Sequence, residues 1–316
     1  MNGLILKGTN NTFSVECEDG KTRLCKIKGK ILKDSEGYYN PLAAGDVVSI
    51  EKDALDDGEG LITALTERKN FFVRRNQKLN APQLLAANID ILLCITSAAN
   101  PPFRPRFADR VSVQAARQNL PVLIIVNKAD LGLLKDTEER IADWQRLGFR
   151  VLCTSSKTKE GIDELKKILS GLTAALTGQS GVGKSSLLNA IAPKLQLKTA
   201  PVSYKYDRGT HTTTQGELFK INTETEDGAA HSITLIDTPG IRNFSIWGIP
   251  HEQVIFYFPE MEVLAGKCKF GLSCSHTHEK GCAVLEALQT GTVHRDRYAA
   301  WRLIKEEIET LTKGEY

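Results

Sequence analysis

The order of two loops constrains the fold of this chain more than any other feature. "GQSGVGKS", from Gly178 to Ser185, lies between an apolar stretch and a helix-forming one and matches the phosphate-loop pattern G-x-x-x-x-G-K-[ST]. "NKAD", from Asn127 to Asp130, matches a guanine-reading loop but lies about fifty residues upstream. A standard GTP-binding domain has these loops in the reverse order. Either one match is accidental or the domain is circularly permuted.

The phosphate loop has the context that its chemistry needs, a strand before it and a helix after it. Its glycines let backbone N–H groups turn inward around phosphates, while Lys184 reaches the β and γ phosphates and the Ser185 hydroxyl binds magnesium. Lys184 is also a candidate catalytic residue because it stabilises charge on the transferred phosphoryl group. The expected nucleotide-binding residues of this loop are Gly178, Gln179, Ser180, Gly181, Val182, Gly183, Lys184, Ser185 and Ser186.

"LIDTPG" supplies a second phosphate-site motif about fifty residues after the first. Asp237 ends an apolar strand, where a carboxylate can hold magnesium, commonly through water. The Gly240 N–H can meet the γ-phosphate. An Asp-x-x-Gly sequence alone would be a turn, and its spacing from the phosphate loop is what gives it weight.

"NKAD" predicts selection of guanine. The Asp130 carboxylate can accept hydrogen bonds from the guanine N1–H and 2-amino group, which adenine does not offer. Asn127 can contact the base edge and brace the loop, while the Lys128 stem packs on the ring. "TSSK", from Thr154 to Lys157, matches a further guanine loop, with serine where alanine is usual. Its expected contact residues are Ser155, Ser156 and Lys157.

Taken together, the motifs run NKAD, SSK, phosphate loop, switch threonine and DTPG. A standard GTPase runs phosphate loop, switch threonine, DxxG, NKxD and SAK. Moving the last two elements to the front, with the order inside each group kept, is a circular permutation. Both groups match in order and in local context, so neither is accidental.

With these motifs the chain resembles the RsgA/YjeQ family of circularly permuted GTPases over nearly its whole length. The resemblance also rests on "GTHTTTQGEL", which is similar to the family's switch segment, and on the terminal "CKFGLSCSHTHEKGC". It implies an enzyme that binds GTP and GDP, hydrolyses GTP, assists late maturation of the small ribosomal subunit, binds rRNA and is released after hydrolysis. Hydrolysis would be slow alone and stimulated by the subunit.

The pattern of expected strands and helices changes twice along the chain, which predicts three domains. Residues 1–68 contain five β-rich segments separated by turns, as expected for an OB-fold barrel. The family resemblance implies that this domain binds RNA or the ribosome. Residues 69–246 alternate apolar strands with amphipathic helices, as expected for an α/β GTPase; the basic stretch "KNFFVRRNQKLNAPQLLA" within them reads as a linker. Residues 247–316 are expected to form a helical zinc-binding domain. It ends in a predicted helix whose apolar face is made by Tyr298, Trp301, Ile304, Ile308 and Leu311.

The clustered cysteines predict a structural metal site. Cys268, Cys274, His276 and Cys282 have the spacing C-x5-C-x-H-x5-C, and three thiolates with one imidazole suit one tetrahedral zinc ion. The family resemblance implies this ligand set, although its first spacing is usually four residues, so His278 is an alternative ligand. The isolated thiols Cys17, Cys25, Cys94 and Cys153 read as reduced and packed.

The residue after Gly240 bears on catalysis. Many GTPases have a glutamine there that orients the attacking water, whereas this chain has Ile241. His211 in "GTHTTT" is the nearest candidate replacement, a role that the family resemblance also supports; a surface histidine is the alternative. Thr213 is the expected magnesium ligand of the switch, with Thr212 as the alternative.

Composition is consistent with this interpretation but does not require it. The net charge of +3 permits a nucleic-acid partner, and we expect a cytoplasmic monomer with no signal peptide and no membrane span. The rival interpretation is a non-catalytic RNA-binding factor that uses GTP only as a conformational ligand. The barrel sequence is basic, which is ordinary for a solvated face but fits RNA under the family resemblance; its basic residues are Lys7, Lys21, Arg23, Lys26, Lys28, Lys30 and Lys33.

Overall fold

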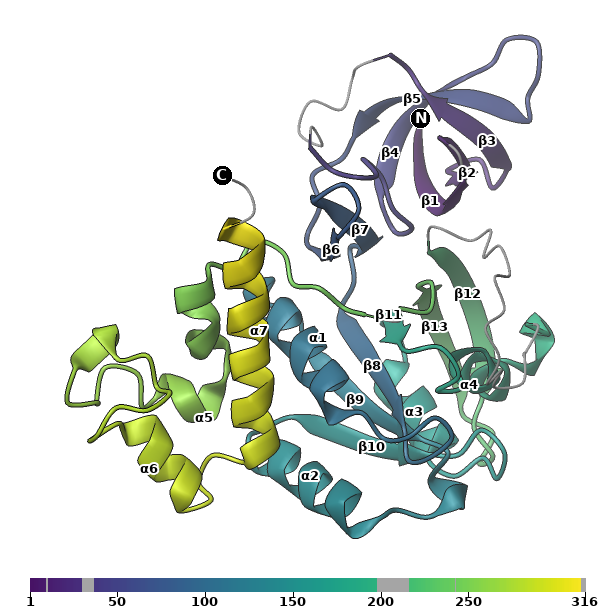
Figure 1. Cartoon of the computed structure of the whole chain (residues 1–316). Helices are drawn as coiled ribbons and strands as arrows, with labels where there is room; N and C mark the ends of the chain where they lie inside the picture. Colours follow the sequence, from purple (N-terminus) through teal and green to yellow (C-terminus); the bar gives the residue numbers. More distant parts are fainter. Residues whose placement is uncertain (10, 30–36, 198–215, 242, 314–316) are drawn as a thin grey trace.

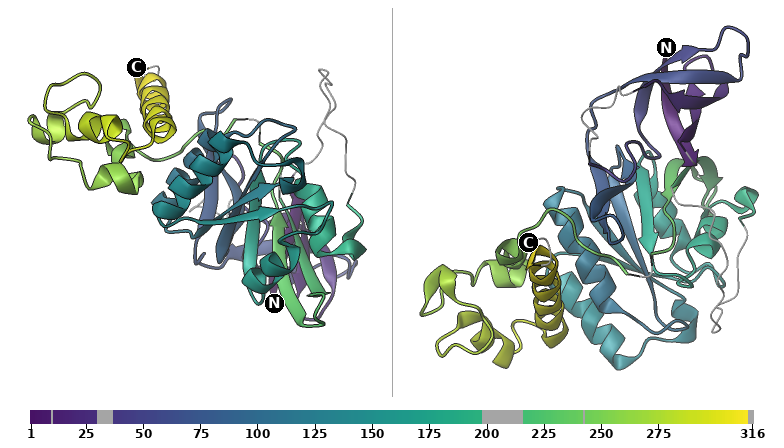
Figure 2. Two further views of the ribbon diagram at one scale, coloured as in Figure 1. Left: turned by 90° about the horizontal axis from the view of Figure 1, so that it is seen from below. Right: turned by 45° about the horizontal axis from the view of Figure 1, so that its top comes forward.

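The computed structural model describes residues 1–9, 11–29, 37–197, 216–241 and 243–313. Figure 1 shows a small barrel at the N-terminus, a central sheet with helices packed on it, and a helical part at the C-terminus. These are the three architectures that the sequence predicts. In Figure 2 the barrel and the C-terminal helices lie at different ends of the central sheet.

The N-terminal barrel is made by five strands that close on themselves. Its strands follow the order β1-β2-β3-β5-β4, and β4 pairs again with β1. Alternate side chains of each strand point inward, so that Phe13, Val15 and Cys17 of β2 are buried. The expected OB-like barrel is confirmed. The bounds are β1 Asn2–Thr9, β2 Thr12–Cys17, β3 Thr22–Ile27, β4 Val47–Lys52 and β5 Glu59–Leu65.

The central sheet has the strand order β10-β9-β8-β11-β13-β12, with only β12 antiparallel to its neighbour. Successive residues of β8 face opposite cores: Leu92 and Cys94 pack with α1 and α2, and Leu93 and Ile95 pack with α3 and α4. The strands are β8 Ile91–Ser97, β9 Val122–Asn127, β10 Arg150–Thr154, β11 Thr173–Gly178, β12 Glu217–Glu224 and β13 Ala230–Asp237. The helices are α1 Pro105–Arg117, α2 Lys135–Arg146, α3 Ile162–Leu169 and α4 Lys184–Ile191, with short 3-10 turns at Ala129–Leu131 and Pro193–Leu195.

The stretch expected to be a linker is instead a β-hairpin, β6 Phe71–Asn76 and β7 Ala81–Ala87. The linker prediction was wrong because the basic residues, which suggested solvent exposure, have partners within the protein. The Arg75 guanidinium lies 4.9 Å from the Trp247 ring centroid, and its backbone N–H donates to the Ser245 carbonyl at 2.9 Å. The buried Phe72 ring stacks on Phe244. The hairpin therefore packs on the chain that follows Gly240.

The barrel continues the central sheet, because β1 pairs with β12 at Lys7 and Glu217. The two side chains of this pair form an exposed ion pair at 3.0 Å, and Lys220 pairs with Glu16 nearby. A barrel turn also approaches the hairpin and the sheet closely: a Cβ on Gly45 would lie 2.1 Å from the Ala87 carbonyl oxygen at the end of β7 and 3.0 Å from the Ile236 side chain of β13. Any larger residue at Gly45 would force this barrel turn away from both.

The C-terminal part consists of short helical turns packed on one long helix, as predicted. Its elements are η4 His251–Tyr257, α5 Pro259–Glu262, η5 Gly271–Ser273, α6 Ala283–Gln289 and α7 Arg295–Lys313. Helix α7 lies beside α1 of the central domain (Figure 1). Trp301, Ile304 and Ile308 of the predicted apolar face are buried.

A buried charge network joins α7 to the central domain. Asp109 of α1 accepts hydrogen bonds from Arg297 of α7 at 3.0 Å, from Arg140 of α2 at 2.6 Å and from the Trp144 indole at 3.0 Å. Arg297 also makes two bonds to Glu260 of α5, at 2.6 and 2.8 Å. All five side chains are buried, so each charge depends on its partners within this network.

None of the helices in the described ranges combines the length and the apolar character that crossing a membrane requires.

Candidate functional site

The predicted site residues converge because parallel strands end at the same edge of a sheet. Asn127 ends β9, Thr154 ends β10, Gly178 ends β11 and Asp237 ends β13. The chain builds β8, β9 and β10 outward in that order and then returns to place β11 on the other side of β8. Ligands of open α/β sheets bind at the carboxyl edge where the strand order reverses in this way. The permuted order therefore still produces one site.

The phosphate loop is shaped by glycines with positive φ. Gly181 has φ 82° and Gly183 φ 93°, and α4 begins directly afterwards at Lys184. The Lys184 ammonium donates to the carbonyls of Gly178 at 2.9 Å and Gln179 at 3.2 Å. Burial lowers the pKa of Lys184, and the Asp237 carboxylate opposes that shift. When a phosphate binds, the Lys184 ammonium would exchange these contacts with carbonyl oxygens for contacts with negatively charged phosphate oxygens.

Asp237 is a buried carboxylate with an unused oxygen. Burial raises its pKa to about 6; Lys184 opposes the shift and Glu217 adds to it. Its buried Oδ1 has no hydrogen-bond partner among the described residues. An unpartnered carboxylate oxygen beside the Lys184 ammonium is of the oxygen-donor type that magnesium prefers.

The chain after Asp237 passes close to the phosphate loop. A Cβ on Gly240 would lie 3.4 Å from the Lys184 Nζ, so the glycine N–H is near the phosphate position. The Ile241 N–H donates to the Gly178 carbonyl at 3.2 Å, and the Ile241 side chain is only 2% exposed. The residue at the usual glutamine position therefore points into the core.

Asn127 braces the guanine loop against the phosphate loop. Its amide donates to the Val182 carbonyl at 3.0 Å and its oxygen accepts from the Thr154 hydroxyl at 3.2 Å. A Cβ on Gly183 would lie 2.5 Å from the Asn127 amide nitrogen, so the two loops touch. Lys128 donates to the Gly181 carbonyl at 2.8 Å. Sequence reasoning missed Thr154, although it stands at the start of the "TSSK" motif that was recognised.

Asp130 is held by a residue of the second guanine loop. The Ser155 hydroxyl donates to Asp130 Oδ1 at 2.7 Å and accepts the Thr158 N–H at 3.0 Å. A pocket of about 420 Å³, the candidate guanine pocket, opens beside them. Its lining residues are Asn127, Lys128, Asp130, Leu131, Ser156, Lys157, Gly183 and Ser186. Ser155 does not line this pocket, so its contribution is to orient the Asp130 carboxylate.

Three of the predicted switch residues, His211, Thr212 and Thr213, fall in the range 198–215, outside the described residues. The described chain resumes at Gly216, where a Cβ would lie 3.2 Å from the Asp237 carbonyl oxygen. The described chain therefore resumes beside the backbone of Asp237, whose side chain is the candidate magnesium ligand.

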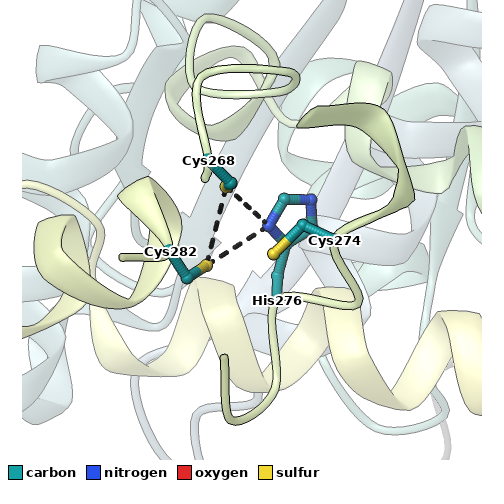
Figure 3. A group of neighbouring side chains, drawn as sticks. All are labelled: Cys268, Cys274, His276 and Cys282. Carbon is teal, nitrogen blue, oxygen red and sulfur yellow. Dashed lines mark hydrogen bonds between the residues drawn. The ribbon is translucent and has the colours of Figure 1, made fainter. Parts of the chain in front are cut away.

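Cys268, Cys274, His276 and Cys282 form a group that can hold a metal ion (Figure 3), with their candidate ligand atoms all within 4.8 Å of one another. The Cys268 and Cys282 sulfurs are 3.7 Å apart, and His276 Nδ1 lies 3.3 and 3.4 Å from them. Zinc–sulfur bonds of about 2.3 Å in a tetrahedron place two sulfurs roughly 3.8 Å apart, so the donor set fits zinc. His278 is exposed and lies outside the group.

The metal-binding loop is supported by α7. The Tyr298 hydroxyl donates to the His276 carbonyl at 2.8 Å, and the Trp301 ring packs edge-on against His276. Glu279 closes the turn by accepting the N–H groups of Ser275 and Thr277. Hydrogen bonding from the Ser275 side chain, with smaller contributions from backbone N–H groups of the turn, holds the pKa of Glu279 well below its usual range. The first cysteine spacing contains the short 3-10 turn η5, which lies between Cys268 and Cys274.

The basic barrel residues are less available than the sequence suggests. Lys7, Lys21 and Lys28 each pair with a carboxylate, and Arg23 is fully buried between Asp19 and Asp57. Lys30 and Lys33 lie outside the described residues. A charge count over the barrel sequence therefore overstates its free positive charge.

Comparisons with known proteins agree with this geometry. The sequence model of the RsgA GTPase family matches residues 65–247. The "Small ribosomal subunit biogenesis GTPase RsgA" of Chlorobaculum tepidum is 37% identical over 308 residues, which cover 95% of this chain and 96% of that protein. YjeQ from Thermotoga maritima has a TM-score of 0.68 at 29% identity, covering 97% of this chain and 98% of that one.

A second solved structure is described as circularly permuted. YloQ, described as a circularly permuted GTPase, has a TM-score of 0.64 at 28% identity and covers 98% of this chain and 95% of its own. The family match, the full-length relative and the permuted site lead to one conclusion: this chain belongs to the RsgA family of circularly permuted GTPases.

Proposed function

We propose that this chain hydrolyses GTP as a late assembly factor of the small ribosomal subunit, binds its rRNA and is released after hydrolysis. The observation that carries the proposal is the meeting of a guanine pocket and a phosphate loop at one sheet edge, in the order found in the family. The name of the Chlorobaculum tepidum relative supports the ribosomal part. Attack of water on the γ-phosphate is the proposed chemistry.

Each loop has a distinct part in this mechanism. Asp130, oriented by Ser155, reads the guanine N1–H and 2-amino group. Lys184 and the loop N–H groups hold the phosphates and stabilise charge that develops on them. Ser185, Thr213 and Asp237 would hold magnesium, which supplies neutralising charge between the β and γ phosphates. His211 would orient the attacking water.

One observation favours a second function. The Ile241 side chain is buried, so it leaves the usual water-orienting position without a polar group. A factor that binds RNA and uses GTP only as a conformational ligand would show such a site. Turnover with and without purified small subunits separates the two functions: stimulation supports the first, and no phosphate release in either condition supports the second.

His211→Ala is expected to remove most of the subunit-stimulated hydrolysis, on the order of 10²-fold, while GTP and subunit binding stay as in the native protein. The physical reason is loss of an interaction made only in the transition state. Single-turnover phosphate release with saturating subunits measures it. Lys184→Ala is the contrast, because it should weaken nucleotide binding itself. A His211→Ala protein stimulated as strongly as the native one would remove the histidine from the mechanism.

We further propose zinc as the ion of the Cys268–Cys282 group, at one per chain. Cys274→Ser is expected to lose this zinc and to loosen residues 260–313 in hydrogen exchange, while GDP affinity is kept because the guanine pocket lies in the central domain. Cys153→Ser is the matched control, since this half-buried thiol lies outside the metal-binding group. Metal analysis that finds no zinc in protein purified without chelator contradicts the proposal.

A further inference from the structure

A second pocket, of about 640 Å³, lies beside the phosphate loop and is distinct from the guanine pocket. Five parts of the chain meet there: the β6–β7 turn at Gln77, the start of α1 at Arg104, the phosphate loop at Gln179, the chain after Gly240 at Phe244, and α7 at Glu307. Helices α1 and α7, which border it, run side by side in Figure 1. No role in the proposed hydrolysis uses this pocket.

Arginine side chains give the pocket its charge. Arg104 and Arg106 are exposed, and neither side chain makes a hydrogen bond or ion pair with another described residue. Arg110, by contrast, pairs with Glu307 at 2.5 Å. Two acidic residues, Asp296 and Glu307, also line the pocket. The Asp296 carboxylate forms no ion pair with another described residue, whereas Glu307 is already paired with Arg110. The first turn of α1 contains no acidic residue, so its positive dipole end adds to the two free guanidinium groups.

The pocket wall is connected to both loops that reach the phosphates. Gln179 belongs to the phosphate loop, and Ser245 follows Gly240 by only a few residues. The Gln77 amide donates to the Ser245 hydroxyl at 2.6 Å, and that hydroxyl donates to Glu307 at 2.8 Å. A molecule in the pocket would therefore touch the walls of the nucleotide site without entering it.

We propose that this pocket receives a phosphodiester segment of RNA, bound by Arg104 and Arg106, and that this contact transmits subunit binding to the hydrolytic site. The inference rests on the proposed function and names the partner chemistry of its regulation. Guanidinium groups match phosphate oxygens in a bidentate geometry. The half-buried Phe103 ring lines the same pocket and offers a surface on which an unpaired base can stack.

The test is the double variant Arg104→Ala/Arg106→Ala against the matched control Lys135→Ala/Arg150→Ala, whose exposed basic residues lie outside the pocket. Affinity for purified small subunits, and for their protein-free rRNA, is measured over a range of salt. We expect the slope of log affinity against log salt to fall by about 1.4 to 1.8 in the pocket variant, because two phosphate contacts are lost. Stimulated hydrolysis at saturating subunits should fall on the order of tenfold, with unstimulated hydrolysis and GDP affinity unchanged.

The outcomes separate this inference from the proposed function. A pocket variant with the native salt slope, or one matched by the control, overturns the inference even if the native protein is stimulated. The inference is also overturned if the salt slope of the pocket variant differs from the native slope with subunits but not with protein-free rRNA, because the pocket then binds protein. If subunits fail to stimulate the native protein, the hydrolytic proposal fails, and the slope on rRNA alone still decides whether the pocket binds RNA.

Discussion

Asp130→Asn is expected to weaken GDP binding by on the order of 10³-fold, because two charge-assisted hydrogen bonds worth roughly 2 kcal/mol each are lost. The amide nitrogen would then face the guanine 2-amino group, donor against donor. Xanthine has a carbonyl at this place, so xanthosine diphosphate should bind the variant better than GDP does. Titration of fluorescent nucleotide analogues with displacement by GDP, XDP and ADP measures both changes.

Two further variants make this result specific to the carboxylate. Asp136→Asn removes an exposed carboxylate on α2, outside the guanine pocket, and should leave GDP affinity unchanged. Ser155→Ala removes the 2.7 Å bond that orients Asp130 and should weaken GDP about tenfold without favouring xanthine. Equal affinity of the native protein for ADP and GDP would end the guanine assignment.

Arg297→Met is expected to lower the free energy of unfolding by about 3–5 kcal/mol, since it leaves the Glu260 carboxylate buried without its cationic partner. Asp109 loses one of its two guanidinium partners and keeps Arg140. The methionine keeps much of the arginine stem, so the change reports charge more than volume. Hydrogen exchange should show the loss mainly in α5, α7 and the chain between them. Thermal unfolding followed in parallel gives the overall loss of stability.

Arg302→Met is the matched control on the same helix. Arg302 is about half exposed and pairs with Glu306 at 3.3 Å, an arrangement worth only about 0.3–0.5 kcal/mol. If the two variants lose the same stability, the buried network does not hold the C-terminal part to α1. Nucleotide affinity should stay native in both, because neither residue lines the guanine pocket.

The features that could be predicted from sequence were those encoded within a few residues. Gly183 with Lys184 marks both the phosphate loop and the start of α4, and the helix begins at that residue. The four metal ligands lie within fifteen residues, so their chemistry was visible without the fold.

What could not be predicted depends on pairings between distant segments. The basic segment that forms β6 suggested solvent exposure because the partners of Arg75 come about 170 residues later in the chain. These partners are the Trp247 ring and the Ser245 carbonyl. Asp109 and its partner Arg297 are 188 positions apart, so the local sequence around either one does not indicate that the pair is buried. Whether the Arg104 side chain finds a hydrogen-bond or ion-pair partner likewise depends on which neighbours the fold brings close. Burial of a charge is a property of the whole packing, which periodicity does not report.

The strand order also has a consequence for the chain as it is made. β8 is buried along its whole length, and β9, with β10 beyond it, covers only one of the two edges of β8. Its other neighbour, β11, ends 81 residues after β8 does. At translation rates of about 5–20 residues per second, roughly 4–16 s separate the two strands. For that interval the nascent half-sheet presents an open backbone edge at what becomes the centre of the domain, the kind of edge to which stray strands add.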